Sequence, residues 1–227
     1  MEREPERIPR PAGDDHGDVL AAIRDGYDRG SHAYRGDTFE RYPRSGYAHW
    51  LRRLESRVRP DSRVLELGCG NGIPVAAELA KRHRVTGVDL SPVQVERARK
   101  LVPGARFVCD DMCRVQFEPA SFDAVTAFFS IIHVPLAEQP ALIASIARWL
   151  VPGGWCLAVV GRAARTETER NWRGVPGATM HWSHADVATY RAWFAAAGFR
   201  IAEEGVQPED GSPGFSVLIA TKDTSQD

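Results

Sequence analysis

The sequence lacks any apolar run long enough to span a membrane, and its first 30 residues have no apolar core of the kind that a signal peptide needs. It also lacks a charge excess, because 29 Lys and Arg residues oppose 30 Asp and Glu residues, for a formal net charge of −1. Binding to nucleic acid or to a membrane surface requires a basic field, so this balance argues against both. We therefore expect a protein of the cytoplasm that binds neither nucleic acid nor membrane.

Lysine and cysteine are both scarce in this chain. The only lysines are Lys81, Lys100 and Lys222, so almost every basic residue is Arg, which we interpret, together with abundant Ala and Gly, as the mark of a GC-rich bacterial genome. Because we expect a cytosolic protein, we expect its cysteines to be free, reduced thiols. The four cysteines are Cys69, Cys109, Cys113 and Cys156.

The first sixty residues differ in pattern from the rest of the chain. Residues 1–15 are charged, carry prolines and lack any period, so we expect a disordered tail. Apolar spacing predicts one helix over 18–30 and a second over 46–58, with an irregular aromatic stretch to about Tyr42 between them. Residues 16–60 are thus a predicted helical cap that contributes to the acceptor site, and residues 61–227 are the predicted core.

From Arg63 onward, short apolar strands alternate with helices of ten or more residues, the pattern of an α/β fold with a parallel sheet and helices on both faces. The chain closes with two strands joined by a turn-rich segment, which is typical of a hairpin. Residues 161–183 read as a long loop, which we interpret as a lid or acceptor wall. The predicted strands cover 63–67, 84–89, 105–109, 122–128, 154–160, 199–206 and 214–221, and the predicted helices cover 73–82, 91–102, 138–151 and 184–197.

The stretch that organises the core is Val64-Leu65-Glu66-Leu67-Gly68-Cys69-Gly70-Asn71-Gly72, a strand followed by three glycines at every second position. Glycine tolerates a tight turn and lets a ligand approach the backbone. The helix expected to start at Ile73-Pro74 would offer unpaired N–H groups to an anion. Dinucleotide folds require G-x-G-x-x-G, and Ile73 stands where the last glycine should be, which disfavours an NAD-linked oxidoreductase.

This stretch resembles the first motif of class I S-adenosylmethionine (SAM)-dependent methyltransferases, in their bacterial small-molecule branch. Further stretches follow in the family's order, among them Asp89 after the second strand, Asp111-Met112 after the third and Pro152-Gly153-Gly154 before the fifth. The resemblance implies a Rossmann-like sheet of six parallel strands and one antiparallel strand. It also implies SAM as the cofactor and S-adenosylhomocysteine as the product.

Several residues match the family's cofactor site. Asp89 lies about 20 residues past the first glycine, where an acid can accept hydrogen bonds from both ribose hydroxyls, although it could instead stabilise a helix N-terminus. The resemblance implies that Asp111 accepts from the adenine amino group and that Met112 packs on the ring. It also implies that Tyr34 closes over the cofactor carboxylate, and the alternative is an ordinary residue of the amphipathic cap. Glu66 suits a ligand that carries an ammonium group. The predicted cofactor residues are Tyr34, Glu66, Gly68, Cys69, Gly70, Gly72, Asp89, Leu90, Asp111, Met112 and Phe128.

His133 is the candidate catalytic residue. It follows the fourth strand, where the donor methyl should lie, and a neutral imidazole can take a proton from an acceptor; the alternative is a histidine that shapes this loop through backbone hydrogen bonds. His181 and His184 are three residues apart, a spacing that can ligate zinc, but no third ligand is evident and we expect no metal. The predicted substrate residues, drawn from the least family-like parts of the chain, are Tyr27, Trp50, Trp172, His181 and Trp182.

These features predict methyl transfer from SAM to a small, partly apolar or aromatic acceptor in bacterial secondary or cofactor metabolism, by a monomer or homodimer. Whether the methylated atom is O, N, S or C stays open. The segment Phe128-Phe129-Ser130-Ile131 lacks the Pro-Pro-aromatic signature of amino-methylases that act on nucleic acid. The alternative is a protein of this fold that binds SAM without transferring methyl, as a cyclase or a regulatory module.

Overall fold

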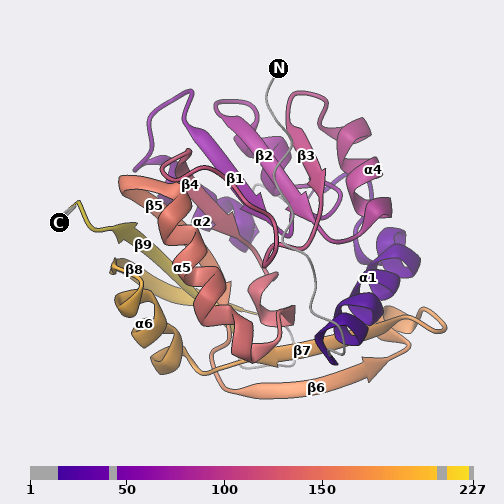
Figure 1. The fold of residues 1–227 in the computed structure, drawn as a ribbon. Coiled ribbons are helices and arrows are strands. Elements are labelled where there is room, and N and C mark those ends of the chain that lie inside the picture. The colour runs from indigo at the N-terminus through magenta and orange to yellow at the C-terminus, as the bar shows by residue number, and fades with distance from the viewer. Residues whose placement is uncertain (1–14, 41–44, 209–213, 225–227) are drawn as a thin grey trace.

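The computed structural model describes residues 15–40, 45–208 and 214–224. The central sheet contains β1 (Arg63–Leu67), β2 (Arg84–Asp89), β3 (Arg106–Cys109), β4 (Phe122–Ala127), β5 (Leu150–Val160), β8 (Phe199–Gln207) and β9 (Phe215–Lys222). These seven strands lie in the order β3-β2-β1-β4-β5-β9-β8 (Figure 1). Both neighbours of β9 pair with it antiparallel, and the other pairs are parallel. The predicted sheet of six parallel strands and one antiparallel strand is confirmed.

Helices cover both faces of this sheet. One face carries α5 (Gln139–Trp149) and α6 (Val187–Ala196), and the other carries α2 (Gly46–Glu55), α3 (Val75–Leu79) and α4 (Pro92–Leu101) (Figure 1). Each face has its own apolar core, because successive side chains of a strand point to opposite sides. In β1, for example, Leu65 packs with the α5 and α6 core whereas Val64 packs with the α2, α3 and α4 core.

The first helix of the cap is longer than predicted. α1 spans Asp15–Tyr34, whereas the sequence pattern predicted a helix that ends near Gly30. Gly30 lies inside this helix, and the Trp172 ring packs against it so closely that an added Cβ would come within 3.3 Å of a ring carbon. Ser31, one residue on, donates its hydroxyl to Gln94 of α4 at 2.8 Å. Two distant segments therefore hold the last turn of α1 in helical form.

The segment over 161–183, predicted as a loop, is mostly strand. It forms a two-stranded antiparallel sheet of β6 (Arg165–Arg170) and β7 (Thr179–His184), with the 3₁₀ turn η4 (Trp172–Gly174) between them. β6 is exposed along its whole length and alternates charged residues with threonine, so no apolar period marks it as a strand. β7 packs against α1, where Gly26 allows the Thr179 carbonyl to approach closely (Figure 1).

The start of α6 also differs from the prediction. The predicted helix covers 184–197, but α6 begins at Val187, and Asp186 caps it by accepting from Thr189 N–H at 2.8 Å. Ser183 lies in β7, and its hydroxyl accepts from the N–H of Leu136. Leu136 belongs to η3 (Leu136–Glu138), so this serine ties the hairpin to the segment that follows β4.

Three other boundaries shift. The helix after the glycines, predicted over 73–82, is the five-residue α3, with Pro74 at its N-cap rather than inside it. β5 begins at Leu150 rather than at residue 154, so the last two residues of the helix predicted over 138–151 belong to this strand. Ser91 caps α4 by accepting from the N–H of Gln94, whose side chain accepts from Ser31 of α1. The predicted tail, except for Asp15, together with Tyr42 and the turn over 209–213, lies outside the described residues.

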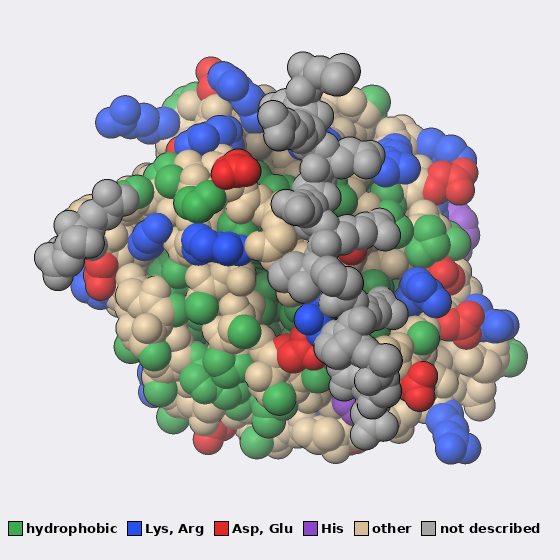
Figure 2. Space-filling model, viewed as in Figure 1, with side chains coloured by type: hydrophobic (Ala, Val, Ile, Leu, Met, Phe, Trp, Pro, Cys, Tyr) green, Lys and Arg blue, Asp and Glu red, His purple; other side chains and the backbone are tan. Residues whose placement is uncertain are grey.

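The surface and the cysteines add little chemistry. In the view of Figure 2, acidic and basic side chains are scattered over the coloured surface, and neither sign gathers into a field. All four cysteines are free. Within the described ranges, no helix is both long and apolar enough to cross a membrane.

Candidate functional site

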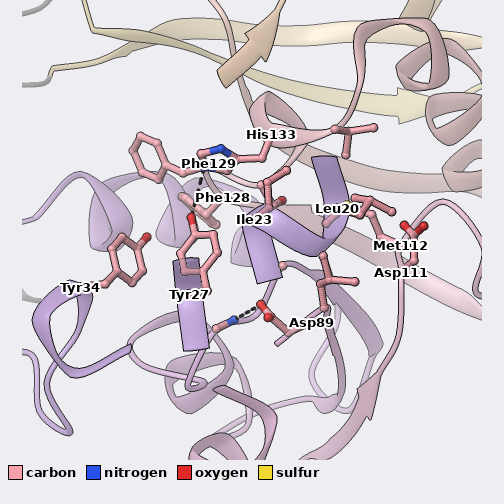
Figure 3. Close-up of a pocket in the computed structure, with 15 residues that line it drawn as sticks. Leu20, Ile23, Tyr27, Tyr34, Asp89, Asp111, Met112, Phe128, Phe129 and His133 are labelled. Carbon is pink, nitrogen blue, oxygen red and sulfur yellow. Dashed lines mark hydrogen bonds between the residues drawn. The ribbon is translucent and has the colours of Figure 1, made fainter. Parts of the chain in front are cut away.

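An open cavity of about 640 Å³ lies beyond the carboxyl ends of β1, β2 and β4, under α1 (Figure 3). Its lining joins four stretches that are far apart in the sequence: α1, the glycine loop, the exits of β2 and β3, and the exit of β4. Open α/β sheets bind ligands at this edge, so this cavity is the expected site. It is lined by Leu20, Ile23, Tyr27, Tyr34, Gly68, Gly70, Asp89, Leu90, Asp111, Met112, Phe128, Phe129, Ser130, His133 and Val134.

The glycine loop meets the cavity through its backbone. Gly68 has a φ of +71°, and a Cβ there would stand 2.2 Å from the Cβ of Ser130, which follows β4. Gly70 has a φ of +54°, and a Cβ there would meet nothing within 4 Å, so its open side faces the cavity. Gly68 is thus required for packing, whereas Gly70 leaves room for a ligand to touch the backbone.

Asp89 is fixed at the edge of the cavity by two backbone N–H groups. Its carboxylate accepts from Gly70 at 2.8 Å and from Ser91 at 2.9 Å (Figure 3). Burial raises the pKa of Asp89 to about 6, and the two N–H donors act in the opposite direction. The carboxylate therefore bridges the glycine loop and the start of α4 while still lining the cavity.

Asp111 and Met112 lie at one end of the cavity, and Tyr34 lies at the other (Figure 3). The Asp111 side chain is 6% exposed and accepts from the N–H of Cys113 at 2.9 Å. Asp110, which has the same side chain one residue earlier, accepts from the N–H of Asp111 and does not line the cavity. Of the two adjacent acids, the structure therefore directs Asp111 to the cavity.

A second cavity of about 320 Å³ adjoins the first at Tyr34, Gly68, Gly70 and Phe128. Glu66 and Cys69 line it, whereas Gly72 packs away from both cavities, against α4 and β3. Glu66 is 3% exposed, and one of its carboxyl oxygens has no hydrogen-bond partner among the described residues. Burial is the main cause that raises the pKa of Glu66 well above its usual range, and the negative charge of the nearby Asp89 adds to it. A ligand ammonium at this place would favour the ionised carboxylate.

His133 is held in a defined orientation by contacts on both ring nitrogens. Nδ1 lies 2.8 Å from the carbonyl oxygen of His181, which can only accept, so Nδ1 carries the proton. Nε2 therefore has the free lone pair, and the Tyr27 hydroxyl donates to it at 3.1 Å (Figure 3). Burial, together with the proximity of His184 and His181, lowers the pKa of His133 to about 4, and the hydrogen bond to the His181 carbonyl acts in the opposite direction. The imidazole is neutral at pH 7, with its basic nitrogen turned to Tyr27.

Aromatic rings surround this pair. The Tyr27 ring lies edge-on to Tyr34, Trp172 and His133, with centroids 5.1–5.9 Å apart. The Trp182 ring lies 4.7 Å from the His133 ring, and its indole N–H donates to Glu169. Burial raises the pKa of Tyr27 well above its usual range, so this phenol stays protonated as a donor.

The predicted substrate residues do not all reach the cavity. Tyr27 lines it directly, and His181 contributes its backbone carbonyl to His133. Trp172 is 3% exposed and packs behind Tyr27 and Tyr34 without lining the cavity. Trp50 is also buried, in the core beside Gly205 of β8, away from the site. The structure therefore shows both tryptophans packed in the interior, and their roles in substrate binding stay predictions.

The pair His181 and His184 does not sit on a helix, because both residues belong to β7. The His181 ring contacts Thr168 of β6, and the His184 side chain lies buried beside Phe215. In the described part of the chain, no three His, Cys, Asp or Glu side chains form a group that could hold a metal ion.

Sequence reasoning missed residues that shape the site from a distance. Gln139, fully buried, donates to the carbonyls of Val134 and Ser183 and accepts from the Tyr190 hydroxyl at 2.6 Å, which joins the His133 segment to β7 and α6. Phe129 lines the cavity with a φ of +55°, which is unusual for a bulky residue. No local pattern marks either residue, because their partners come from other elements.

Comparison with known proteins agrees with this geometry. The profile of a family described as a methyltransferase domain matches residues 64–154. A ubiquinone biosynthesis O-methyltransferase of Xanthomonas axonopodis pv. citri is 30% identical over 175 residues, which cover 67% of this chain and 69% of that protein. The chain spans only about a third of the length of the sterol 24-C-methyltransferases that it matches, such as that of Clavispora lusitaniae, at 33% identity.

Solved structures share the fold at low identity. The 1,6-didemethyltoxoflavin-N1-methyltransferase of Burkholderia thailandensis superposes with a TM-score of 0.69 at 19% identity, over 97% of this chain and all of that one. The [4+2]-cyclase SpnF superposes with a TM-score of 0.66 at 19% identity, over 89% of this chain and 95% of that one. These solved structures show the fold. The 30% identity to the Xanthomonas relative, with 69% of that protein covered, and the match to the methyltransferase-domain family establish that the chain belongs to the S-adenosylmethionine-dependent methyltransferases.

Proposed function

We propose that this protein transfers the methyl group of SAM to a small, partly apolar or aromatic acceptor in bacterial secondary or cofactor metabolism. The observation that carries the proposal is the juxtaposition, in one cavity, of a cofactor half made of Gly70, Asp89 and Asp111 and an aromatic half that contains Tyr27 and His133. The Xanthomonas relative is an O-methyltransferase by name, which favours a hydroxyl oxygen as the acceptor atom.

The residues present fit the cofactor. Asp89 offers a carboxylate for the ribose hydroxyls, Asp111 offers one for the adenine amino group, and Leu90 and Met112 offer apolar faces for the ring. The open side of Gly70 gives the ligand access to the backbone, and Glu66 retains a buried oxygen without a partner among the described residues. When bound, the cofactor supplies an electrophilic methyl group on a sulfonium.

The aromatic half would orient the acceptor. Tyr27 donates to His133 Nε2, and its own oxygen can accept from an acceptor hydroxyl. When the acceptor oxygen takes the methyl group, whose bond to the sulfonium sulfur would break to leave a neutral thioether, the proton of that oxygen would pass to Tyr27 and the Tyr27 proton would pass to Nε2. Because the pKa of His133 is only about 4, this histidine is a weak base, so positioning would supply most of the rate.

The test of the proposed function is a calorimetric titration of the purified protein with SAM, S-adenosylhomocysteine and NADH, beside Asp89→Ala. We expect both sulfur ligands to bind at about micromolar strength, roughly −8 kcal/mol, and the variant to lose them. Binding of NADH alone would contradict the proposal. Acceptors are then screened by transfer of radiolabelled methyl to phenols, thiols and amines, with phenols expected to react.

The alternative function is binding of SAM without methyl transfer, as in a cyclase or a regulatory module. The [4+2]-cyclase SpnF has the same fold, so the fold does not separate the two functions. The discriminating measurement is whether S-adenosylhomocysteine accumulates when acceptor is present. Accumulation supports the methyltransferase.

The remaining expectations also stay proposals. A small-molecule acceptor suits the net charge of −1 and the scattered charges on the face that Figure 2 shows, where no basic field for nucleic acid is seen. The cytoplasmic location and the monomeric or dimeric state are predictions that fractionation and light scattering can test. The division into a cap that contributes to the acceptor site and a core is supported by Leu20, Ile23 and Tyr27 of α1 at the cavity.

A further inference from the structure

Within the part of the chain that the structure describes, β7 has a neighbouring strand on one edge only. β6 pairs along that edge, whereas the backbone carbonyls of His181 and Ser183 accept hydrogen bonds from side chains. These two residues alternate in the strand, and the carbonyls of alternate residues point to the same edge. Side chains from the segment that follows β4 therefore bond to β7 in place of a second neighbouring strand.

Gln139, the first residue of α5, contributes two of the donors in this arrangement. Its side chain is fully buried, and Nε2 donates to the carbonyl of Ser183 at 2.5 Å and to that of Val134 at 2.7 Å. Its Oε1 accepts from the Tyr190 hydroxyl at 2.6 Å. Because the two carbonyls can only accept and the hydroxyl donates, the amide has one satisfactory orientation. One side chain thus joins the segment after β4 to β7 and to α6.

The two carbonyls that Gln139 binds lie close in sequence to His133 and to its partner. Val134 directly follows His133, and Ser183 lies two residues after His181 in β7. Nδ1 of His133 donates to the His181 carbonyl at 2.8 Å. Gln139 therefore fastens together the backbone that carries the imidazole and the backbone that carries its hydrogen-bond acceptor.

This fastening bears on the tautomer of the ring. In a neutral imidazole, the hydrogen bond that one nitrogen makes decides where the single proton lies. With a fixed carbonyl at Nδ1, Nε2 of His133 keeps its lone pair and accepts from the Tyr27 hydroxyl. If the carbonyl moved away, the proton could lie on Nε2, which would then donate to the Tyr27 oxygen. The two side chains would remain hydrogen-bonded, but His133 could no longer take a proton from Tyr27.

We infer that Gln139 is a positioning residue that sets the tautomer of His133, and with it the direction in which a proton passes between Tyr27 and His133. The catalytic consequence rests on the proposed function, whereas the tautomer is a property of the protein itself. Gln139 lines neither cavity, so it acts through the position of β7 and not on a ligand. A purely structural role would lower stability and leave the tautomer unchanged.

The test measures the tautomer in the purified protein without ligand. Long-range ¹⁵N–¹H correlation spectra of protein labelled with ¹⁵N-histidine distinguish Nδ1–H from Nε2–H, and the signals of His133 are those that His133→Asn lacks. The test variant is Gln139→Met, which keeps a long side chain without an N–H donor. The matched control is Thr221→Val, because the buried Thr221 hydroxyl also lies within hydrogen-bond distance of two backbone carbonyls, those of Gly153 and Lys222, and lines neither cavity.

We expect the wild type and Thr221→Val to show only the Nδ1–H form of His133. Gln139→Met should populate the Nε2–H form as well, and its kcat for methyl transfer should fall about tenfold while its affinity for S-adenosylhomocysteine stays within about twofold. Gln139→Glu, which burial keeps protonated, retains the bond from Tyr190 and one donor, so its change should be smaller. This variant decides the test if Gln139→Met does not fold.

A His133 ring that stays wholly in the Nδ1–H form in the folded Gln139 variants would overturn the inference, whatever their stability. An equal change in Thr221→Val would also overturn it, because the loss of any buried hydrogen bond would then suffice. If the wild type transfers no methyl group to any acceptor, the proposed function fails, yet the spectra still decide whether Gln139 sets the tautomer. The two failures are therefore distinguishable.

Discussion

The two halves of the cavity are built by different means. In the cofactor half, the polar side chains bond over short separations in the chain: Asp89 accepts from Ser91 and from Gly70, 19 positions earlier, and Asp111 accepts from Cys113. In the aromatic half, Tyr27 meets a partner 106 positions away at His133, which in turn bonds to a residue 48 positions further on. Local contacts hold the first half, and tertiary packing holds the second.

This difference has a functional consequence. A site held by short-range bonds survives changes elsewhere in the fold, so the cofactor half can stay constant while the cap and the hairpin vary. The aromatic half depends on α1 and the β6–β7 hairpin lying together, since Trp172 of the hairpin packs on Gly30 and Tyr27 of α1. We therefore expect damage to the cap to change acceptor recognition before it changes cofactor binding.

The strongest test of this separation is Trp172→Ala. Removal of a fully packed ring should lower the free energy of unfolding by about 3–5 kcal/mol and raise the acceptor KM, while the affinity for S-adenosylhomocysteine stays within a few-fold. Trp50→Ala is the matched control, since Trp50 is also buried, at 6% exposed, but packs beside Gly205 of β8 and away from the cavity. Denaturant titration, calorimetry and acceptor kinetics measure the three effects. A large loss of cofactor affinity in Trp172→Ala would break the comparison.

Asp89→Ala is the converse test in the cofactor half. It removes the acceptor of two backbone N–H groups together with the expected ribose contacts, so the affinity for S-adenosylhomocysteine should fall about 100-fold, or about 3 kcal/mol. Asp123→Ala is a matched control, because Asp123 pairs with Arg63 and lines neither cavity. Comparable losses in the two variants would contradict the role of Asp89.

His133→Asn probes the acceptor half without disturbing its backbone contact. The Asn amide can still donate to the His181 carbonyl, but nothing replaces Nε2. We expect kcat to fall about 100-fold, the lower end for loss of a general base, with unchanged affinity for S-adenosylhomocysteine. A kcat within threefold of the wild type would reduce His133 to a residue that shapes the loop.

The wild type and His133→Asn should also differ in how their free energy of unfolding depends on pH. Burial lowers the pKa of His133 to about 4 in the folded state, against about 6.5 when unfolded, so the unfolded state binds more protons between these values. Stability should therefore be lost as the pH falls below about 6.5. Relative to His133→Asn, the wild type should lose about 2 kcal/mol between pH 7 and pH 5 in denaturant titrations. Parallel pH profiles would contradict the neutral, buried imidazole.

Tyr27→Phe should give the smallest of these effects. The ring and its packing remain, and only the hydroxyl that donates to Nε2 is lost. We expect kcat to fall about tenfold, or about 1.4 kcal/mol, with stability changed by less than about 1 kcal/mol. Single-turnover methyl transfer measures the step directly. A rate equal to that of the wild type would remove Tyr27 from the proton path.

Much of the fold and of the cofactor half could be predicted from the sequence, because their signals are local. Strands β1 and β2 match their predicted bounds, and the glycine spacing with Asp89 and Asp111 indicated the cofactor. The hairpin β6–β7 could not be predicted in this way. Its outer strand is exposed throughout and has no apolar period, and its register is set by pairing with β7.

The sequence by itself determined the sheet, the order of its elements and the family, since alternation of short apolar strands with helices and a glycine loop at a strand end leave few arrangements. Only the tertiary structure decided which side chains face the acceptor. It buried Trp50 and Trp172 and turned the Nε2 of His133 to Tyr27. The physical reason is that these side chains are oriented by partners that lie far away in the sequence, and no local pattern records such contacts.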